Sequence, residues 1–135
     1  TGVQTCALPI SSYIFSNPTL PDDLIPYWDY NAPGIPDEPR DVSAATVTAS
    51  ALYELSMYDE TNRTGYVDRA DRILENLTNR YRASVGKDCG FLLLHSTGSK
   101  THGSEVDVPI VYADYYYLEA LLRKAKLEKE GTALL

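Results

Sequence analysis

A regular amphipathic pattern between residues 66 and 81 is the feature that most constrains the fold. Apolar side chains recur there at intervals of three and four residues, so an α-helix places them all on one face. The positions in this series are Tyr66, Ala70, Ile73, Leu74, Leu77 and Tyr81. A face this continuous requires neighbouring elements that cover it, which predicts a helix over 66–81 inside a packed helical assembly.

The preceding segment predicts a second helix, over residues 42–58. Asp41 is a favourable N-cap, because its carboxylate accepts hydrogen bonds from the free N–H groups of the first helical turn. Small residues such as Ala45 and Ala49 fall on one stripe of this helix. They would allow another helix to approach closely.

A last helix is expected over 113–129, and a short helical segment over 11–16. The expected inner face of the last helix consists of Leu118, Leu121, Leu122 and Ala125. Lysines near its C-terminal end suit the helix dipole, whose negative pole lies there.

Two irregular segments separate these helices. Residues 17–39 contain six prolines, which fix φ and remove backbone donors, so neither a helix nor a central strand is expected there. Long loops inside compact domains are usually functional or disordered, and the apolar and aromatic residues of this loop, such as Ile25, Tyr27 and Trp28, disfavour disorder. After residue 86, apolar stretches at 91–95 and 106–111 flank a polar loop at 96–104, which predicts two short strands in a β-hairpin-like insertion.

The composition is that of a globular protein, with 44% hydrophobic and 23% charged residues. No apolar run reaches the length of a membrane span, and no membrane partner is expected. The net charge of −7 disfavours a nucleic-acid surface, which needs clustered Lys and Arg, although a few local cations can still hold an anionic small substrate. Eleven tyrosines suit carbohydrate-facing surfaces and equally suit half-buried helix faces.

Residues 1–10, TGVQTCALPI, differ in character from the rest of the chain. They show no helical or strand period, and they match codon by codon the translation of a widely used sequencing adapter. We therefore expect an artefact there, with Ser11 as the first natural residue and further natural chain before it. The compartment, bacterial cytoplasm or periplasm, stays open because a signal peptide would lie in that missing part. With Cys6 excluded, Cys89 has no partner for an internal disulfide.

Three stretches are long and unusual in composition. They are PYWDYNAPGIPDEPRDVSAA from Pro26, GFLLLHSTGSKTHGSEVDVP from Gly90 and YADYYYLEALLR from Tyr112. In order and spacing they resemble the C-terminal part of glycoside hydrolase family 88, the unsaturated glucuronyl hydrolases. The resemblance implies an all-α fold, an (α/α)6 barrel with long loops, of which residues 11–135 would be a C-terminal fragment of a single catalytic domain.

The resemblance also implies an activity. Family members remove an unsaturated, 4,5-double-bonded uronic acid from glycosaminoglycan-type oligosaccharides that polysaccharide lyases produce. An aspartate protonates the double bond and activates water, and the hydrated sugar then collapses and releases its partner, which is general acid–base chemistry. These aspartates lie in the N-terminal half of the family, so no catalytic residue is expected in this chain, which should be inactive alone. No metal or other cofactor is implied.

The loop at 96–100 carries the first candidate substrate contacts. Some family members hold a sulfate on the second sugar through a Ser-x-x-Ser-x-Lys pattern, and the resemblance implies this role for Ser96, Ser99 and Lys100. The lysine is displaced by one residue, because Thr101 occupies the position of the pattern. Two hydroxyls, loop N–H groups and one cation can still cradle an anion. The alternative is a solvated loop without a ligand.

Trp28 and Asp29 in the proline-rich loop are the second pair of candidate substrate contacts. In one interpretation, Trp28 stacks on a sugar ring and Asp29 hydrogen-bonds to it. In the other, Trp28 packs the loop onto the barrel and Asp29 accepts hydrogen bonds from nearby backbone N–H groups, as Asp often does in loops.

Other functions fit the residues less well. The residues His95, His102, Cys89, Glu105 and Asp107 match no zinc or calcium spacing, and no G-x-S-x-G motif supports a hydrolase triad. The unsaturated rhamnogalacturonyl hydrolases share the barrel and are an alternative, although HSTGSKTHGSEVDVP favours the glucuronyl family. A non-catalytic helical binding scaffold is a further alternative, but the helices show no repeat period.

Overall fold

The computed structural model describes the backbone of residues 2–132 and the side chains of residues 9–129. Its elements are the helices α1 (Gly2–Ser16), α2 (Val42–Leu55), α3 (Arg63–Arg80) and α4 (Val111–Thr132), with the short 3₁₀ turns η1 (Asp88–Gly90) and η2 (Lys100–His102). Within residues 2–132 the chain forms no β-strand. No helix of this part is long and apolar enough to cross a membrane.

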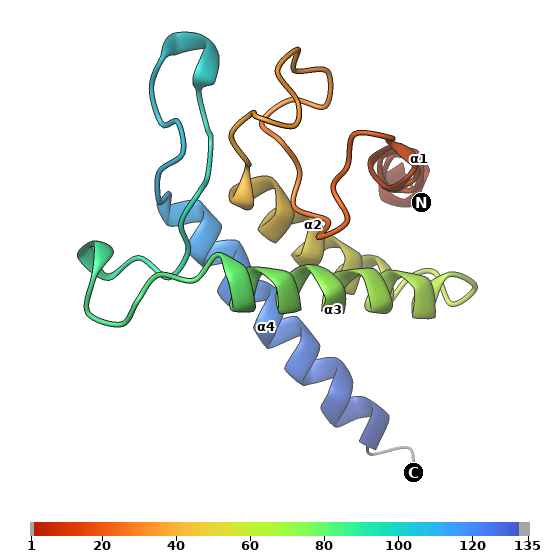
Figure 1. The fold of residues 1–135 in the computed structure, drawn as a ribbon. Coiled ribbons are helices and arrows are strands. Elements are labelled where there is room, and N and C mark those ends of the chain that lie inside the picture. The colour runs from red at the N-terminus through yellow and green to blue at the C-terminus, as the bar shows by residue number, and fades with distance from the viewer. Residues whose placement is uncertain (1, 133–135) are drawn as a thin grey trace.

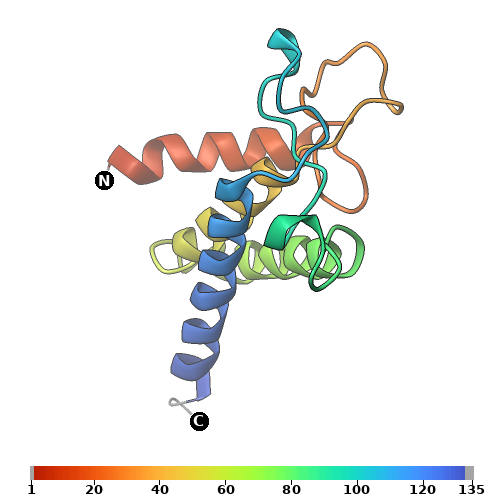
Figure 2. The same ribbon diagram turned by 90° about the vertical axis from the view of Figure 1, so that its left-hand side faces the viewer.

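The long connections gather at one end of the helices. α2 packs against both α3 and α4, and the C-terminal end of α3 lies beside the starts of α2 and α4 (Figure 1). The two long loops, residues 17–41 and 81–110, rise from that end. α1 runs toward the same end, while its N-terminal end extends away from the body (Figure 2).

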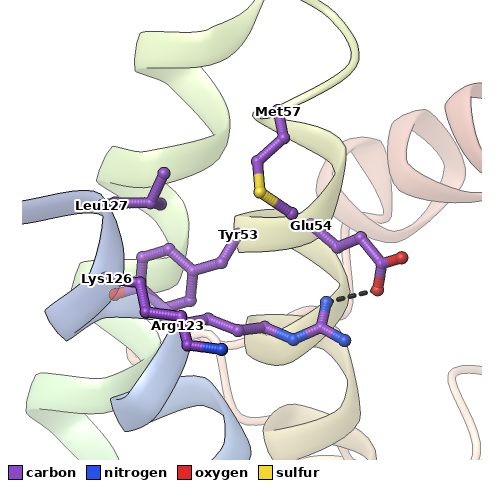
Figure 3. A pocket seen from close by; sticks show the side chains of 6 residues that line it. All are labelled: Tyr53, Glu54, Met57, Arg123, Lys126 and Leu127. Carbon is purple, nitrogen blue, oxygen red and sulfur yellow. Dashed lines mark hydrogen bonds and ion pairs between the residues drawn. The ribbon is translucent and has the colours of Figure 1, made fainter. Parts of the chain in front are cut away.

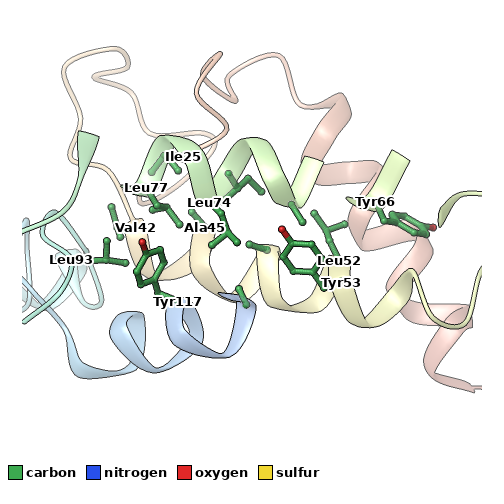
Figure 4. Close-up of a cluster of buried hydrophobic side chains, with 14 of the residues drawn as sticks. Ile25, Val42, Ala45, Leu52, Tyr53, Tyr66, Leu74, Leu77, Leu93 and Tyr117 are labelled. Atoms are coloured by element: carbon green, nitrogen blue, oxygen red, sulfur yellow. The ribbon is translucent and has the colours of Figure 1, made fainter. Parts of the chain in front are cut away.

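The core lies between α2, α3 and α4. The amphipathic face expected on α3 is confirmed, since Tyr66, Ala70, Ile73, Leu74 and Leu77 are all buried. Small and apolar residues of α2 meet this face, and Tyr53 among them is fully buried (Figure 4). Each large apolar side chain buried in this way contributes about 1.5–3 kcal/mol to folding.

The expected inner face of α4 is wrong. Leu118 and Leu122 are 54% and 57% exposed, and Leu121 and Ala125 are exposed as well. The residues that α4 buries are instead Ala113, Tyr117 and Ala120. Two alanines on one face let α4 approach the alanine-rich α2 closely, whereas leucines at the contact would hold the two backbones apart.

The boundaries of α2, α3 and α4 lie within a few residues of the expected ones, whereas the N-terminal helix begins much earlier than expected. The segment expected to begin at residue 11 is one helix from Gly2, with Pro9 inside it, although residues 1–10 show no helical period. Asp41 caps α2 as predicted, because its carboxylate accepts a hydrogen bond from the Ser43 amide.

The strands expected at 91–95 and 106–111 do not form. In their place are isolated antiparallel bridges, among them Ser96 with Val108 and Ser99 with Ser104. Within these stretches His95 and Asp107 have φ angles of 67° and 55°, which interrupt an extended backbone. The insertion keeps the outline of a hairpin without a sheet.

Candidate functional site

The hairpin-like insertion is held at its base by backbone hydrogen bonds. The Ser96 and Val108 amides each donate to the other residue's carbonyl oxygen, with both N–O distances 2.9 Å. Gly98 donates to the Glu105 carbonyl oxygen at 2.8 Å. Gly103 then closes the tip with a φ of 68°, a left-handed conformation that glycine adopts without strain.

The proline-rich loop is closed on itself and then joined to this insertion. The Trp28 amide donates to the Pro39 carbonyl oxygen at 3.1 Å, which brings the two ends of the loop together. The Thr97 hydroxyl donates to the Arg40 carbonyl oxygen at 2.9 Å, and the Val42 amide donates to the His95 carbonyl oxygen at 3.2 Å. Two loops that are far apart in sequence therefore form one surface above the start of α2.

A polar cluster joins the two loops where they meet, and we call this meeting place the rim. The cluster consists of Trp28, Gly34, Glu38 and Lys100, and we call it the Glu38 cluster. One carboxylate oxygen of Glu38 accepts from the Trp28 indole N–H at 2.8 Å and from the Lys100 ammonium. The other accepts from the Gly34 amide at 3.2 Å. The Lys100 ammonium also lies 5.1 Å from the centroid of the Trp28 ring, within cation–π range.

The charge of Glu38 is stabilised by these donors. Its hydrogen bond with Lys100, and next its hydrogen bond with Trp28, hold the pKa of the Glu38 carboxyl below its usual range. The Glu38 side chain is 11% exposed and that of Lys100 is 32% exposed. The three donors, from Trp28, Gly34 and Lys100, hold the Glu38 carboxylate in place at the rim.

Asp23 anchors the proline-rich loop to the ends of the helices. Its buried carboxylate accepts hydrogen bonds from the Ile25 amide, from the Arg40 guanidinium at 3.1 Å and from the Tyr81 hydroxyl at 2.9 Å. Burial, and next this hydrogen bond to Asp23, raise the pKa of Tyr81 to about 12. The anchor fixes the base of the loop, so the rim above it is held in place.

The structure separates the three residues predicted to hold an anion together. Ser96 is fully buried, and its hydroxyl has no hydrogen-bond partner among the described residues. The Ser99 hydroxyl lies 3.1 Å from Nδ1 of His102, toward the tip of the insertion. Lys100 turns toward Glu38 in the other loop, so each of the three side chains points to a different environment.

Trp28 and Asp29 point to different partners as well. Trp28 is half-buried within the Glu38 cluster. The exposed Asp29 accepts a hydrogen bond from the Asn31 amide at 2.7 Å. The structure thus brings Trp28 and Lys100 together, while the side chains of Ser96, Ser99 and Asp29 lie outside the Glu38 cluster.

Sequence reasoning missed Glu38, which is the centre of the cluster. It lies 10 residues from Trp28 and 62 residues from Lys100 along the chain. No helical or strand period connects such positions. The only local signal was an acidic residue inside an aromatic, proline-rich loop.

The described residues contain no group of three His, Cys, Asp or Glu side chains that could hold a metal ion. His95 Nδ1 lies 2.7 Å from the Asp107 carboxylate as an exposed pair, and Cys89 is a free, exposed thiol. These residues do not converge on one point.

A separate pocket of about 240 Å³ lies at the opposite end of the helices. It is lined by Tyr53, Glu54, Met57, Arg123, Lys126 and Leu127 (Figure 3). An ion pair between Arg123 and Glu54 crosses it. The pocket is formed by α4, by the C-terminal end of α2 and by Met57 in the turn that follows α2, far along these helices from the two loops.

Several relatives match most of this chain in sequence. An unsaturated glucuronyl hydrolase from Formosa agariphila is 45% identical over 118 residues, which is 87% of this chain and 29% of that protein. An unsaturated glucuronyl hydrolase from Bacillus sp. strain GL1 is 33% identical over 107 residues, and an unsaturated chondroitin disaccharide hydrolase from Streptococcus agalactiae is 32% identical over 107 residues. Each match covers 77% of this chain and less than a third of the relative. No protein-family model matches the chain.

Solved structures agree with the sequence matches. A crystal structure of an unsaturated glucuronyl hydrolase specific for heparin superimposes with a TM-score of 0.87 and 43% identity, over 91% of this chain and 33% of that one. The Bacillus sp. GL1 enzyme superimposes with a TM-score of 0.79 and 29% identity, over 87% of this chain and 31% of that one.

The comparisons extend over the loops as well as the helices. The chain spans about 30% of the length of these relatives. Their fold is the (α/α)6 barrel, so the all-α fold class predicted from the sequence is confirmed, with this chain as a part of that barrel. The chain therefore belongs to the unsaturated glucuronyl hydrolases, glycoside hydrolase family 88.

Proposed function

We propose that this chain forms part of a hydrolase that removes an unsaturated uronic acid from glycosaminoglycan-derived oligosaccharides. The observation that carries the proposal is the agreement in sequence and backbone with one enzyme class, at 43% identity and a TM-score of 0.87. The relatives described above carry glucuronyl or chondroitin disaccharide hydrolase names, and none of these is a rhamnogalacturonyl hydrolase.

The part of the reaction that falls to this chain is contact with the substrate at the rim. We propose Trp28, Asp29, Ser99 and Lys100 as residues that border the bound oligosaccharide, because they lie on the two loops that meet above α2. An aromatic ring with polar groups around it is suited to sugars. Ser96 belongs to this proposal through its backbone, which fixes the base of the hairpin-like insertion.

The chemistry itself is proposed to come from aspartates outside this chain. Protonation of the C4=C5 double bond and addition of water give a hydrated sugar, which collapses and releases its partner. Residues of this chain would orient the oligosaccharide so that the double bond reaches those aspartates. The chain alone is then inactive.

A chimera tests the proposal. Residues 11–135 would replace the matching segment of the Formosa agariphila relative, and loss of the ultraviolet absorbance of the double bond would be followed. Unsaturated disaccharides from heparin, chondroitin and rhamnogalacturonan would be the substrates. We expect turnover of a glycosaminoglycan disaccharide by the chimera, and none by this chain alone or by the truncated relative. A chimera that is folded and monodisperse but inactive would contradict the proposal, as would turnover by the chain alone.

A further inference from the structure

α4 carries a second apolar stripe, on the side opposite to its buried face. Its members are exposed and recur at intervals of three and four residues, and we call them the α4 stripe: Val111, Tyr115, Leu118 and Leu122. Successive residues of an α-helix are about 100° apart, so this series points away from the buried residues Ala113, Tyr117 and Ala120. The α4 stripe is therefore open to contact with another chain.

An apolar groove lies between α1 and α2, and we call it the α1–α2 groove. Its volume is about 280 Å³, and most of the side chains that line it are apolar, among them Ile14 and Phe15 of α1 and Val47, Ala51 and Leu55 of α2. The three α2 residues are four positions apart, so they share one side of that helix. The groove is therefore a concave apolar surface, whereas the α4 stripe is the outer side of a single helix.

The groove and α4 occupy comparable places on α2. α4 packs against α2 and α3, and its Glu119 accepts a hydrogen bond from Ser50 on one side of α2. The groove lies on another side of α2 and is bordered by α1 in place of α3. α2 and α4 also start together, at the end where the loops gather (Figure 1). A second helix of the α4 kind, seated in the groove, would thus repeat the packing that the chain already contains.

The length of the chain sets the number of copies that such a repeat requires. The chain spans 29% of the Formosa agariphila relative and 33% of the heparin-specific enzyme, and the helices of these relatives close into a barrel. α1 to α4 form two of the helix pairs of an (α/α)6 barrel. A unit that fills about a third of a closed ring is related to its neighbour by a third of a turn, so head-to-tail contacts close at three copies.

We propose that the chain associates with itself head to tail in a ring of three copies, with the α4 stripe of each copy seated in the α1–α2 groove of the next. The association is driven by burial of apolar surface that the single chain exposes to water. Both sides of the contact consist of residues of this chain, and none of them is a proposed substrate contact. The inference therefore goes beyond the proposed function and does not rest on it.

Sedimentation equilibrium of the 135-residue chain over a range of concentrations measures the association. We expect the mass to rise from the 15.0 kDa of the monomer to that of the three-membered ring and then to stay constant, because a closed ring has no free edge. A chain that stays monomeric, or whose mass grows without limit, would overturn the proposal.

Two double variants each remove one side of the contact. Leu118→Gln with Leu122→Gln changes the α4 stripe, and Val47→Gln with Ala51→Gln changes the groove, in each case at exposed positions. Each double variant should weaken the association at least about tenfold. Val85→Gln is the control, because Val85 is 94% exposed and belongs to neither surface, so it should associate as the wild type does.

A mixture of the two double variants distinguishes a head-to-tail contact from a symmetric one. The stripe variant keeps an intact groove and the groove variant keeps an intact stripe, so the mixture should form pairs with one copy of each, although neither variant associates alone. A symmetric contact between two α4 stripes would instead leave the groove variant associated by itself, and this result would overturn the proposal.

The rest of the barrel is the other candidate for covering the two surfaces. The Formosa agariphila relative, truncated so that it lacks the segment matching this chain, would be added to the wild-type chain. We expect the ring to form before the relative is added. A chain that stays monomeric alone and binds the truncated relative would overturn the proposal and assign both surfaces to the remaining helices of a barrel.

Hydroxyl-radical footprinting of the unmodified chain covers the case in which a variant does not fold. Val47, Leu118 and Leu122 should lose reactivity together as the concentration rises, whereas Val85 should stay reactive. Protection of the α4 stripe without protection of Val47 would overturn the head-to-tail arrangement. Inactivity of the chimera would count against the proposed function only, since none of these measurements depends on turnover.

Discussion

The phenol hydroxyl of Tyr53 on α2 donates a hydrogen bond to the Asp71 carboxylate on α3, with 2.5 Å between the two oxygen atoms. The Lys124 ammonium of α4 lies 2.8 Å from the same carboxylate oxygen. Three helices are therefore joined at one point, and burial, followed by the bond to Asp71, raises the pKa of the Tyr53 hydroxyl far above its usual value.

Tyr53→Phe tests the strength of this junction. The substitution keeps the buried ring and removes one hydrogen bond to a charged acceptor, which should lower the free energy of unfolding by about 1–2 kcal/mol. Urea unfolding followed by circular dichroism measures the change. Tyr115→Phe on the exposed side of α4 is the matched control and should have no effect. An unchanged stability in Tyr53→Phe would show that Lys124 alone satisfies Asp71.

Tyr81 should make the stability dependent on pH in the alkaline range. Its pKa is raised to about 12 in the folded chain, whereas a tyrosine in an unfolded chain titrates near pH 10. The native state therefore retains a proton that the unfolded state loses. The stabilisation is fully present below pH ~10 and is lost as the pH rises toward about 12.

Urea unfolding at several pH values between about 9 and 11.5 checks this dependence. Tyr81→Phe should be less stable than the wild type at the lower end and should lose less stability as the pH rises. Tyr115→Phe should keep the wild-type slope. Parallel curves for the wild type and Tyr81→Phe would show that Tyr81 is not the group responsible.

Asp114 in the first turn of α4 should hold the first stretch of the hairpin-like insertion. Its two carboxylate oxygens accept from the Leu92 and Leu93 amides at 2.9 and 3.0 Å. Asp114→Ala should speed hydrogen exchange at both amides and lower the free energy of unfolding by about 2 kcal/mol, because both donors lose a charged acceptor. Asp114→Asn, which keeps one carbonyl oxygen, should have a smaller effect. Unchanged exchange at Leu92 and Leu93 in Asp114→Ala would contradict this role.

The exposed leucines of α4 should make the isolated chain associate. Leu118 and Leu122 lie one turn apart and are each more than half exposed. Exposed apolar patches of this kind mark surfaces that other protein normally covers. The double variant Leu118→Gln with Leu122→Gln should shift sedimentation toward the monomer without loss of stability.

Leu77→Gln is the control for this variant. Leu77 is fully buried in α3, so the substitution should cost more than about 2 kcal/mol of stability. A comparable loss from the Leu118 and Leu122 substitutions would mean that those leucines belong to the core of the isolated chain.

The sequence by itself determined α2, α3 and α4 to within a few residues, and the Asp41 cap of α2. The face of α3 follows from an apolar period that matches the helical repeat, and Asp41 follows from the chemistry of the first turn. The irregular backbone of the proline-rich segment, residues 17–39, also follows from the sequence, because prolines disfavour helices and central strands wherever they lie. These properties are local, so a short window of sequence contains them.

Only the tertiary structure decided which face of α4 is buried and what Lys100 binds. α4 carries two competing stripes of nearly the same period, one through Leu118 and Leu122 and one through Ala113, Tyr117 and Ala120. The choice between them depends on how closely α2 can approach, a property of two helices rather than one. The pairing of Lys100 with Glu38 joins residues 62 positions apart, and no periodic pattern encodes that separation. The contact between Lys100 and Glu38 forms because the two loops pack onto the helix ends. The rim then carries an ion pair in place of a free lysine.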